Sequence, residues 1–378
     1  MSIFSSPTVS LGKKWTTFPW VLFFLITVVV CLGILMLYSA GGGSWSPWAM
    51  KQGIRFGVGA VLMVLIALTD IRVWISQAYV LYWGCFALLV AVELLGFVGM
   101  GAQRWVDLYV FQLQPSELMK VTLVLALARY FHGLGEKNVL FFKNLFIPVL
   151  LICLPALLVL RQPDLGTASI LIFVGVLLCF AAGVRLWIFI AGALACAGAF
   201  PILWSLLRDY QKKRIFIFLD PELDPLGAGY HILQSKIALG SGGVWGKGLM
   251  EGTQAHLNFL PEKQTDFIFT MLGEELGMVG CVGLLALYMM ILILSYRIIL
   301  RSRLIFTHLL ALGVTTTFFL HAFINIAMVM GLLPVVGVPL PLMSYGGTSM
   351  LTLLMGMGFL CCVEIHHHVR VSNPSGLL

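Results

Sequence analysis

The chain has 378 residues, of which 60% are hydrophobic and only 10% are charged, and its formal net charge is +7. An ordinary soluble domain carries roughly 25% charged residues, so this composition excludes a water-soluble globular protein. We expect membrane lipid, and no nucleic acid, among the molecules that contact the chain.

Apolar runs between turn residues predict about ten membrane-spanning helices, because a helix needs roughly 20 apolar residues to cross the hydrocarbon core. The expected fold class is an all-α polytopic integral membrane protein, in which residues 1–378 form a single membrane domain. The predicted spans cover residues 18–40, 50–69, 74–97, 114–131, 145–161, 165–183, 186–206, 267–297, 304–331 and 347–365, and a large outer loop, 207–266, joins the seventh span to the eighth.

Basic residues in the short loops predict the orientation of the chain, since Lys and Arg accumulate on the cytoplasmic side of a membrane. They occur at Lys13 and Lys14, before the first span, and then at every second loop, so both termini are expected in the cytoplasm. The first apolar run exceeds the 7 to 15 residues or so of a secretory signal, which indicates a retained anchor.

The first candidate site residues lie in and around the predicted fourth span. Arg104 stands in the outer loop before it, beside Trp105, which is equally explained as an interfacial anchor. Glu117 and Lys120 are three residues apart near the outer end of the span, so both side chains share one helix face and can pair. Ionisable groups at membrane depth indicate function, although a structural ion pair is the alternative. Asp164 is expected at the same outer level and either joins them or caps the sixth span.

The long outer loop is the only loop large enough to hold a site. It carries too many aliphatic and aromatic residues for a disordered linker, which predicts a segment packed on the membrane surface. A short helix is expected from Tyr230 to Leu239, and Lys236 belongs to it. Lys263, near the end of the loop, is a second basic candidate for contact with substrate.

Asp266 is the strongest catalytic candidate, because it is a carboxylate at the point where the long outer loop enters a membrane helix. The apolar residues after it are expected to raise its pKa and make it a better base near neutral pH. The alternative is a helix N-cap formed by Thr265 or Asp266, with Glu262 adding negative charge near the same helix end. Glu274 follows eight residues later and is placed on roughly the same helix face.

The last outer segment, residues 331–341, contains too many Pro and Gly residues for a regular span. Irregular backbone at membrane depth needs protein or water around it, so this segment, with Ser344 and Tyr345 after it, is expected to line a cavity. A histidine cluster, His366 to His368, lacks evident thiol or carboxylate partners and is interpreted as a solvated helix end, with no metal site assigned. The sequence contains no Walker A motif, no dinucleotide-binding glycine pattern and no HExxH motif.

Several long motifs, in the same order, make the chain similar to the SEDS family, named for shape, elongation, division and sporulation. They are Gln162 to Thr167, Asp224 to Tyr230, Gln234 to Ala238, Gly246 to Gly248, Leu260 to Phe267, and Gly331 to Ser349. The resemblance covers nearly the whole chain and is closer to the elongation branch of the family than to the division branch, which is kept as an alternative. Gln264 departs from the pattern, since relatives commonly have His there, and the pKa of the adjacent Asp266 could differ as a result.

The resemblance implies a peptidoglycan glycosyltransferase of the bacterial cytoplasmic (inner) membrane. Such an enzyme polymerises lipid II, a disaccharide on undecaprenyl pyrophosphate, into β-1,4 glycan strands at the outer, periplasmic face. The implied partners are a class B penicillin-binding protein, which is a transpeptidase, and the elongation machinery that maintains rod shape. Asp266 matches the family's essential acid/base candidate, and Glu117, Lys120 and Asp164 match positions that line the same outer cavity.

An α-linked donor and a β-linked product require inversion at the anomeric carbon, and a single displacement needs one base. Our hypothesis is that Asp266 takes the proton from the acceptor 4-hydroxyl, while Lys120 or the basic loop residues offset charge on the departing pyrophosphate. No cofactor is certain, and a divalent cation, Mg²⁺ or Mn²⁺, could assist the departure.

The main rival from another class is a lipid II flippase. A flippase needs a polar route to the cytoplasmic side, whereas the ionisable residues noted above gather at the outer ends of the spans, and this asymmetry favours an enzyme. A third interpretation is a scaffold that recruits a transpeptidase, which predicts that changes to Asp266 leave function intact.

Overall fold

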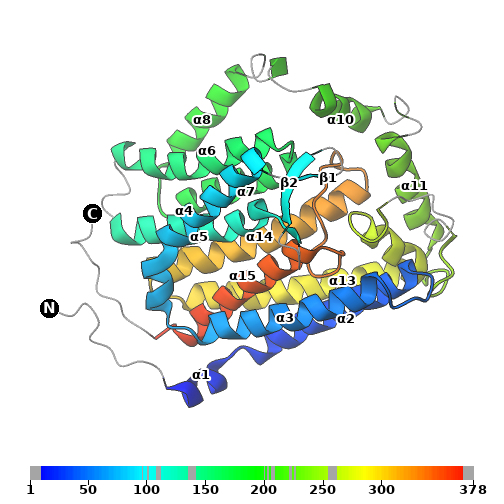
Figure 1. Cartoon of the computed structure of the whole chain (residues 1–378), viewed down its shortest axis with the longest axis horizontal. Helices are drawn as coiled ribbons and strands as arrows, with labels where there is room; N and C mark the ends of the chain where they lie inside the picture. The colour runs from blue at the N-terminus through cyan, green and yellow to red at the C-terminus, as the bar shows by residue number, and fades with distance from the viewer. Residues whose placement is uncertain are drawn as a thin grey trace.

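The computed structural model describes residues 10–95, 97–99, 102–107, 112–134, 142–199, 201, 204–205, 209–220, 224, 227–253 and 262–368. These residues form a bundle of long helices, shown in Figure 1. The helices are α1 (Leu11–Thr17), α2 (Trp20–Ala40), α3 (Trp48–Leu68), α4 (Ile71–Leu95), α5 (Pro115–Leu134), α6 (Phe146–Arg161), α7 (Leu165–Ala181), α8 (Leu186–Gly198), α10 (Asp209–Leu219), α11 (Ala228–Ser241), α13 (Ile268–Arg301), α14 (Ile305–Val329) and α15 (Gly347–Ile365), with the 3-10 turn η1 (Phe142–Leu145) before α6.

Each predicted span coincides with a helix, from α2 through α8 and from α13 through α15. Seven helical segments among the described residues are long and apolar enough to cross a membrane, and α7 and α8 are shorter apolar helices. Helix α5 is different, because Glu117, Lys120 and Arg129 interrupt its apolar sequence. The expected helical membrane fold is confirmed, and the charges on α5 require protein around them in place of lipid.

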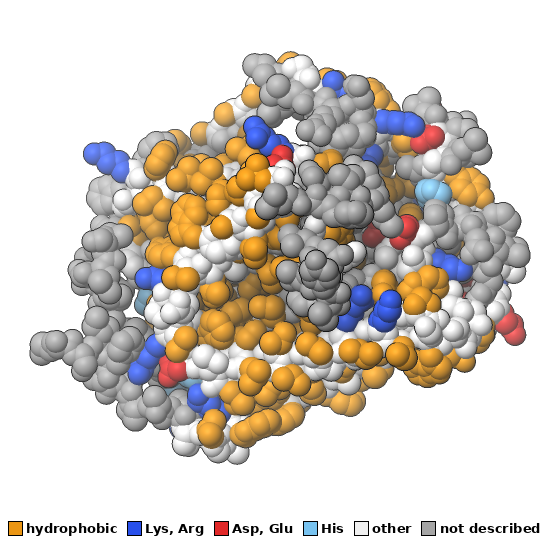
Figure 2. All heavy atoms as spheres, viewed as in Figure 1, with side chains coloured by type: hydrophobic (Ala, Val, Ile, Leu, Met, Phe, Trp, Pro, Cys, Tyr) orange, Lys and Arg blue, Asp and Glu red, His pale blue; other side chains and the backbone are white. Residues whose placement is uncertain are grey.

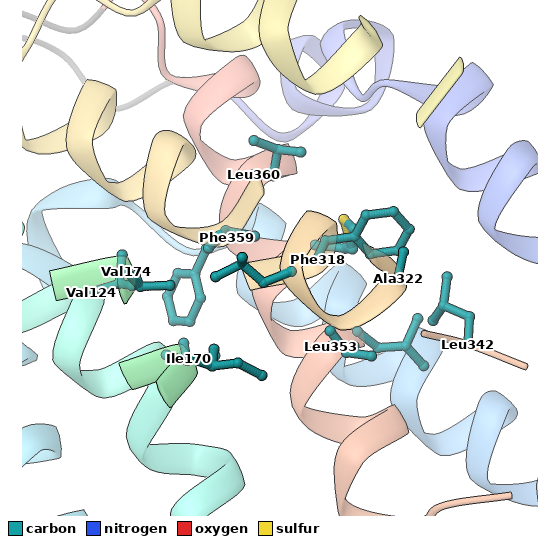
Figure 3. Packing of buried hydrophobic residues seen from close by; sticks show 14 of the residues in the cluster. Val124, Ile170, Val174, Phe318, Ala322, Leu342, Leu353, Phe359 and Leu360 are labelled. Carbon is teal, nitrogen blue, oxygen red and sulfur yellow. The ribbon is translucent and has the colours of Figure 1, made fainter. Parts of the chain in front are cut away.

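The centre of the bundle lies around α5, α14 and α15, which have many buried residues, whereas α8 has none. Figure 3 shows Val124 of α5, Val174 of α7, Phe318 of α14 and Leu353 of α15 in the space between these helices. Lipid tails are as apolar as these side chains, so close packing holds the helices together more than hydrophobic transfer does.

Glycines allow two of the close helix contacts. A Cβ added at Gly59 of α3 would meet the side chain of Leu354 on α15, and one added at Gly313 of α14 would meet the side chain of Val124 at 2.5 Å. Small residues at such crossings are typical of membrane bundles, since they let backbones approach closely.

Helix α13 is broken at Gly277, whose φ of 65° and ψ of −161° are accessible to glycine and strained for other residues. The segment 242–248 packs against this break, where the backbone N–H of Lys247 donates to the carbonyl of Glu274 at 3.0 Å. Asp266 lies in a turn before α13 begins, so the sequence-based placement of Glu274 and Asp266 on one helix face is wrong.

A small antiparallel sheet stands where an outer loop was expected, with strands β1 (Phe97–Gly99), β2 (Ala102–Asp107) and β3 (Gln112–Leu113) in the order β1-β2-β3. These short strands are a local addition to the expected helical fold. The long outer loop contains α11, which matches the expected short helix, and also α10, which was not predicted.

The bundle has two distinct ends. In Figure 1, α11 lies at the right-hand end and α1, with the last turn of α15, lies at the left. We refer to them as the loop end and the α1 end. Helix α14 runs between them, since it begins after the turn that follows α13 and ends at the segment beside Asp266.

Candidate active site

Asp266 lies at the loop end, in a turn of residues 262–267 that leads into α13, and its side chain is half-buried. The N-cap of α13 is Phe267, with no side-chain cap bond, so neither Thr265 nor Asp266 occupies the N-cap position. The Thr265 hydroxyl instead donates to the backbone carbonyl and the carboxylate of Glu262, at 3.2 and 3.1 Å. The helix-cap alternative is therefore not supported.

Three successive backbone carbonyls of this turn each accept a hydrogen bond from a distant part of the chain, and we call this set the carbonyl clamp. The Tyr345 N–H donates to the Gln264 carbonyl at 2.8 Å, the Ser344 hydroxyl to the Thr265 carbonyl at 2.6 Å, and the Asn325 amide to the Asp266 carbonyl at 2.9 Å. Because each bond restricts the backbone, α14 and the segment after it decide where the Asp266 carboxylate points.

Asn325 also joins the turn to the irregular segment after α14. It is fully buried, and its amide donates a second hydrogen bond to the Val338 carbonyl at 2.8 Å. Val338 and Leu340 are buried as well, so this part of the irregular backbone has protein around it, and the expectation that the segment lines a cavity stays a prediction. Gly337 lies near the carboxylate, since a Cβ built there would be 3.7 Å from Asp266 Oδ2.

Helix α3 supports the clamp from the other side. The Gln52 amide donates to the Ser344 carbonyl at 2.9 Å, and the Arg55 guanidinium lies 4.4 Å from the centre of the Tyr345 ring. Such a cation–π contact favours one orientation of the ring. Ser344 and Tyr345, selected from the sequence as cavity residues, therefore act here chiefly as supports of the Asp266 turn.

Glu117 and Lys120 form the predicted pair. Lys120 Nζ lies 2.7 Å from Glu117 Oε1 and 2.7 Å from Nε2 of His321 on α14. The other ring nitrogen of His321 is 2.7 Å from the Thr317 carbonyl, so Nδ1 carries the proton and Nε2 accepts from lysine. Glu117 is 3% exposed and Lys120 2%, which means that this charge network is enclosed and links α5 to α14.

Asp164 and Arg104 remain from the predicted outer cluster. Asp164 accepts from the Thr167 N–H at 3.1 Å, which caps α7, and from the Gln114 amide at 3.2 Å. Among the described residues no hydrogen bond joins it to Glu117 or Lys120, so its capping interpretation is supported. Arg104 belongs to β2, and its side chain lies outside the described residues.

Lys236 and Lys263, the basic residues predicted in the long loop, stand at the loop end. Lys236 is exposed on α11, and its ammonium lies over Gly331, where an added Cβ would be 2.7 Å from Nζ. Lys263 is half-buried in the Asp266 turn, and this burial lowers the pKa of its ammonium below the usual 10.5. Figure 2 shows acidic and basic side chains on the right-hand part of the visible face and again at its lower left, with many hydrophobic side chains between the two.

Asn325, His321 and Arg55 were not predicted from the sequence as site residues. The first two are polar residues one helical turn apart inside the predicted span 304–331, and polar groups at membrane depth are a recognised signal of function. Arg55 lies inside the predicted span 50–69 and could have been found in the same way.

His366 corrects another sequence-based interpretation. It is 1% exposed, and its Nδ1 lies 2.9 Å from the Cys362 carbonyl and 3.5 Å from the Cys362 thiol. His366 is therefore buried, not solvated, and it has a thiol neighbour. Within the described ranges, however, no group of three or more His, Cys, Asp or Glu side chains could hold a metal ion.

Comparison with known sequences gives a family match over residues 16–370, to the model FTSW_RODA_SPOVE, described as cell cycle protein. The peptidoglycan glycosyltransferase MrdB of Escherichia coli K12 is 44% identical over 359 residues, which covers 94% of this chain and 95% of the relative. The probable peptidoglycan glycosyltransferase FtsW of Geobacter sulfurreducens is 36% identical over 360 residues, covering 92% and 95% of the two chains.

Two kinds of solved structure are similar. A chain from work on the structural coordination of polymerization and crosslinking by a peptidoglycan synthase complex superposes with a TM-score of 0.81 at 31% identity, covering 93% of this chain and 99% of that one. The crystal structure of the rod shape determining protein RodA of Thermus thermophilus superposes with a TM-score of 0.71 at 28% identity, covering 94% and 100%.

Proposed function

This chain belongs to the FTSW_RODA_SPOVE family of cell cycle proteins, and we propose that it polymerises lipid II into β-1,4-linked glycan strands. The SEDS resemblance stated from the motifs is confirmed, and the chain is an integral membrane protein and a peptidoglycan glycosyltransferase. The observation that carries the finer proposal is the position of Asp266, a half-buried carboxylate at the loop end whose backbone is held by the carbonyl clamp.

Asp266 is the general base in this proposal. It takes the proton of the acceptor 4-hydroxyl while that oxygen attacks the anomeric carbon of the donor, and the bond from this carbon to undecaprenyl pyrophosphate breaks, with its electron pair leaving on the pyrophosphate. The single displacement inverts the configuration, and no second carboxylic acid is needed, because pyrophosphate leaves without protonation. The clamp supports this role, since a base is effective only when it is held within reach of the proton. The expected rise in the pKa of Asp266 stays a prediction.

The accessible lysines suit the departing pyrophosphate better than Lys120 does. Lys120 is 2% exposed and already paired with Glu117, so its charge is neutralised inside the bundle. Lys236 and Lys263 stand at the loop end with Asp266, and ammonium groups there can offset developing negative charge. We therefore assign Lys120 to the packing of α5 on α14 and the loop-end lysines to the leaving group.

A divalent cation is retained only as a proposal, to be tested by chelation. Because the described residues bring together no group of three or more potential ligands, we derive no step of the reaction from a bound metal. Loss of polymerisation in EDTA, restored by Mg²⁺ or Mn²⁺, would support a cation, and full activity in EDTA would exclude it.

The partner is proposed to be a class B penicillin-binding protein, and the process cell elongation. In support, one similar chain comes from a complex that coordinates polymerization with crosslinking. Identity is higher to MrdB, at 44%, than to FtsW, at 36%, and a rod shape determining protein is among the similar structures.

We also propose that residues 1–378 form one membrane domain with both termini in the cytoplasm and Asp266 on the periplasmic face of the inner membrane. Helices α11 and α1 lie at opposite ends of the bundle (Figure 1), which agrees with this orientation.

The test is polymerisation of purified lipid II by the detergent-solubilised chain together with its class B partner, with Asp266→Asn as the variant. Asn keeps the shape of the side chain and cannot accept the proton, so the folded variant is expected to make no glycan strands. Insensitivity of the wild type to moenomycin would exclude a contaminating polymerase of another class. Polymer from folded Asp266→Asn would support the scaffold interpretation, and movement of labelled lipid II across vesicles without polymer would support the flippase.

A further inference from the structure

A cavity of about 240 Å³ lies at the α1 end of the bundle, opposite to Asp266. It is enclosed by the last turns of α5 and α7, the turn between α13 and α14, and the first turn of α14. The polar part of its lining comes from Arg303 and His308. The apolar part comes from Phe131, Ala182 and Leu309. The proposed glycosyltransferase reaction uses none of these residues.

Positive charge at this end is only partly neutralised by the described acidic residues. Glu364 is paired with Arg301 at 2.9 Å, whereas Arg303 forms no salt bridge within the part of the chain that the structure describes. Arg303 is exposed and lines the cavity, so an anion can reach its guanidinium group.

The cations of this end are close enough to affect one another. The pKa of His368 is lowered, first by the charge of His367, then by desolvation, and further by the positive charges of Lys13 and Arg303, whereas Glu364 acts in the opposite direction. Lys13 belongs to α1 and His368 follows α15, so three separate parts of the chain contribute to one basic patch beside the cavity. An anionic group bound there would relieve this repulsion.

The backbone adds to the attraction. Leu304 and Ile305, at the start of α14, line the cavity, and the N-cap of this helix makes no side-chain cap bond. Its first N–H groups carry partial positive charge, which favours an anion. At the same end of the bundle, the exposed Trp15 of α1 and Trp20 of α2 are stacked with ring centres 5.6 Å apart, and such aromatic residues are typical of the membrane interface.

We propose that this cavity is a binding site for the phosphate headgroup of an anionic phospholipid. Arg303 donates hydrogen bonds to the phosphate oxygens, and the glycerol and first methylene groups lie against Phe131 and Leu309. His308 lines the cavity beside them, and its Nδ1 lies 3.2 Å from the Ile299 carbonyl, to which it donates. A basic, partly apolar pocket between transmembrane helices at the level of the headgroups is suited to such a lipid. A soluble phosphate would use only the polar part of the cavity.

Native mass spectrometry of the detergent-solubilised full-length chain, titrated with phosphatidylglycerol or phosphatidylcholine, tests the proposal. The wild type should retain one phosphatidylglycerol molecule in clear preference to phosphatidylcholine. R303Q should bind it about 10-fold to 100-fold more weakly, the range expected for a lost charge-assisted hydrogen bond. The matched control is R297Q, which removes an exposed arginine from the same end of α13 without touching the cavity and should bind as the wild type does.

A second variant, A182L, fills the apolar part of the cavity and leaves every charge in place, and it too should lose the bound lipid. Thermal unfolding of each variant shows whether it is folded. Equal retention of phosphatidylglycerol by the wild type, R303Q and A182L would overturn the site. Displacement by inorganic phosphate, with no preference between the two lipids, would overturn the lipid assignment and identify a soluble phosphate ligand.

Discussion

The carbonyl clamp predicts that Asn325 positions the catalytic base although it touches no substrate. Asn325→Leu removes the hydrogen bonds to the carbonyls of Asp266 and Val338, at 2.9 and 2.8 Å, and keeps a side chain of similar size. A buried carbonyl that loses its donor costs about 1–3 kcal/mol. With two such carbonyls, we expect the variant to be destabilised by about 2–5 kcal/mol.

The effect on catalysis should exceed the effect on stability. Misplacement of a catalytic group by about 1 Å can cost on the order of 100-fold in rate, so the folded variant should show a fall of that order in kcat, with a smaller change in KM. The assay is polymerisation of lipid II, with rates divided by the folded fraction from thermal unfolding. Ser344→Ala, which removes the bond to the Thr265 carbonyl, should lower kcat in the same direction.

Thr315→Val is the matched control for this experiment. Its hydroxyl bonds at 2.7 Å to the Ala311 carbonyl within α14, so the variant loses a hydrogen bond on the same helix without altering the Asp266 turn. Polymerisation close to the wild-type rate is expected. Wild-type kcat in folded Asn325→Leu and in Ser344→Ala would show that the clamp does not position Asp266.

Three further predictions concern charge, backbone conformation and pH. Lys120→Met leaves the Glu117 carboxylate buried without its cation and should destabilise the protein by about 3–5 kcal/mol. Adding Glu117→Gln removes the unpaired charge and should recover part of this loss, which thermal unfolding of the single and double variants can measure. Gly277→Ala adds a Cβ that meets the backbone of Gly246 at a positive φ, so the purified variant should unfold at a clearly lower temperature than Gly283→Ala, where the space is open. Burial lowers the pKa of His231 below its usual 6.5, so the folded protein binds a proton at this ring less readily than the unfolded protein does. The stability of the wild type should therefore fall as the pH drops through 6.5. Thermal unfolding measured over a series of pH values should show a shallower fall for His231→Gln, and equal slopes for the two proteins would contradict the reasoning.

The membrane helices could be predicted because lipid imposes a local rule on the chain. A span must be apolar over its own length, so its position can be found without knowledge of its neighbours. The turn between α6 and α7 and the short helix α11 were also predicted, from Pro, Gly and capping residues close in sequence. The sheet at β1 to β3 was not, since its pairing of short strands leaves little periodicity to detect.

The site was predicted in its residue types more than in its arrangement. The Thr265–Asp266 motif and its place at a helix entrance pointed to the base, and the spacing of Glu117 and Lys120 pointed to their pair, which the structure contains at 2.7 Å. The third member of that network, His321, is 201 residues away from Lys120 in sequence. Its involvement follows from the packing of α14 on α5, which no local pattern contains.

By itself, then, the amino-acid sequence determined the membrane class, the order of the apolar helices, the family and the candidate base, because each depends on composition or on motifs that are local. The tertiary structure decided which groups hold that base. Asn325 meets the Asp266 carbonyl across 59 residues, and Ser344 meets the Thr265 carbonyl across 79. Such hydrogen bonds form only after helices distant in sequence have packed side by side, and the same packing encloses Lys120 and leaves Lys236 exposed.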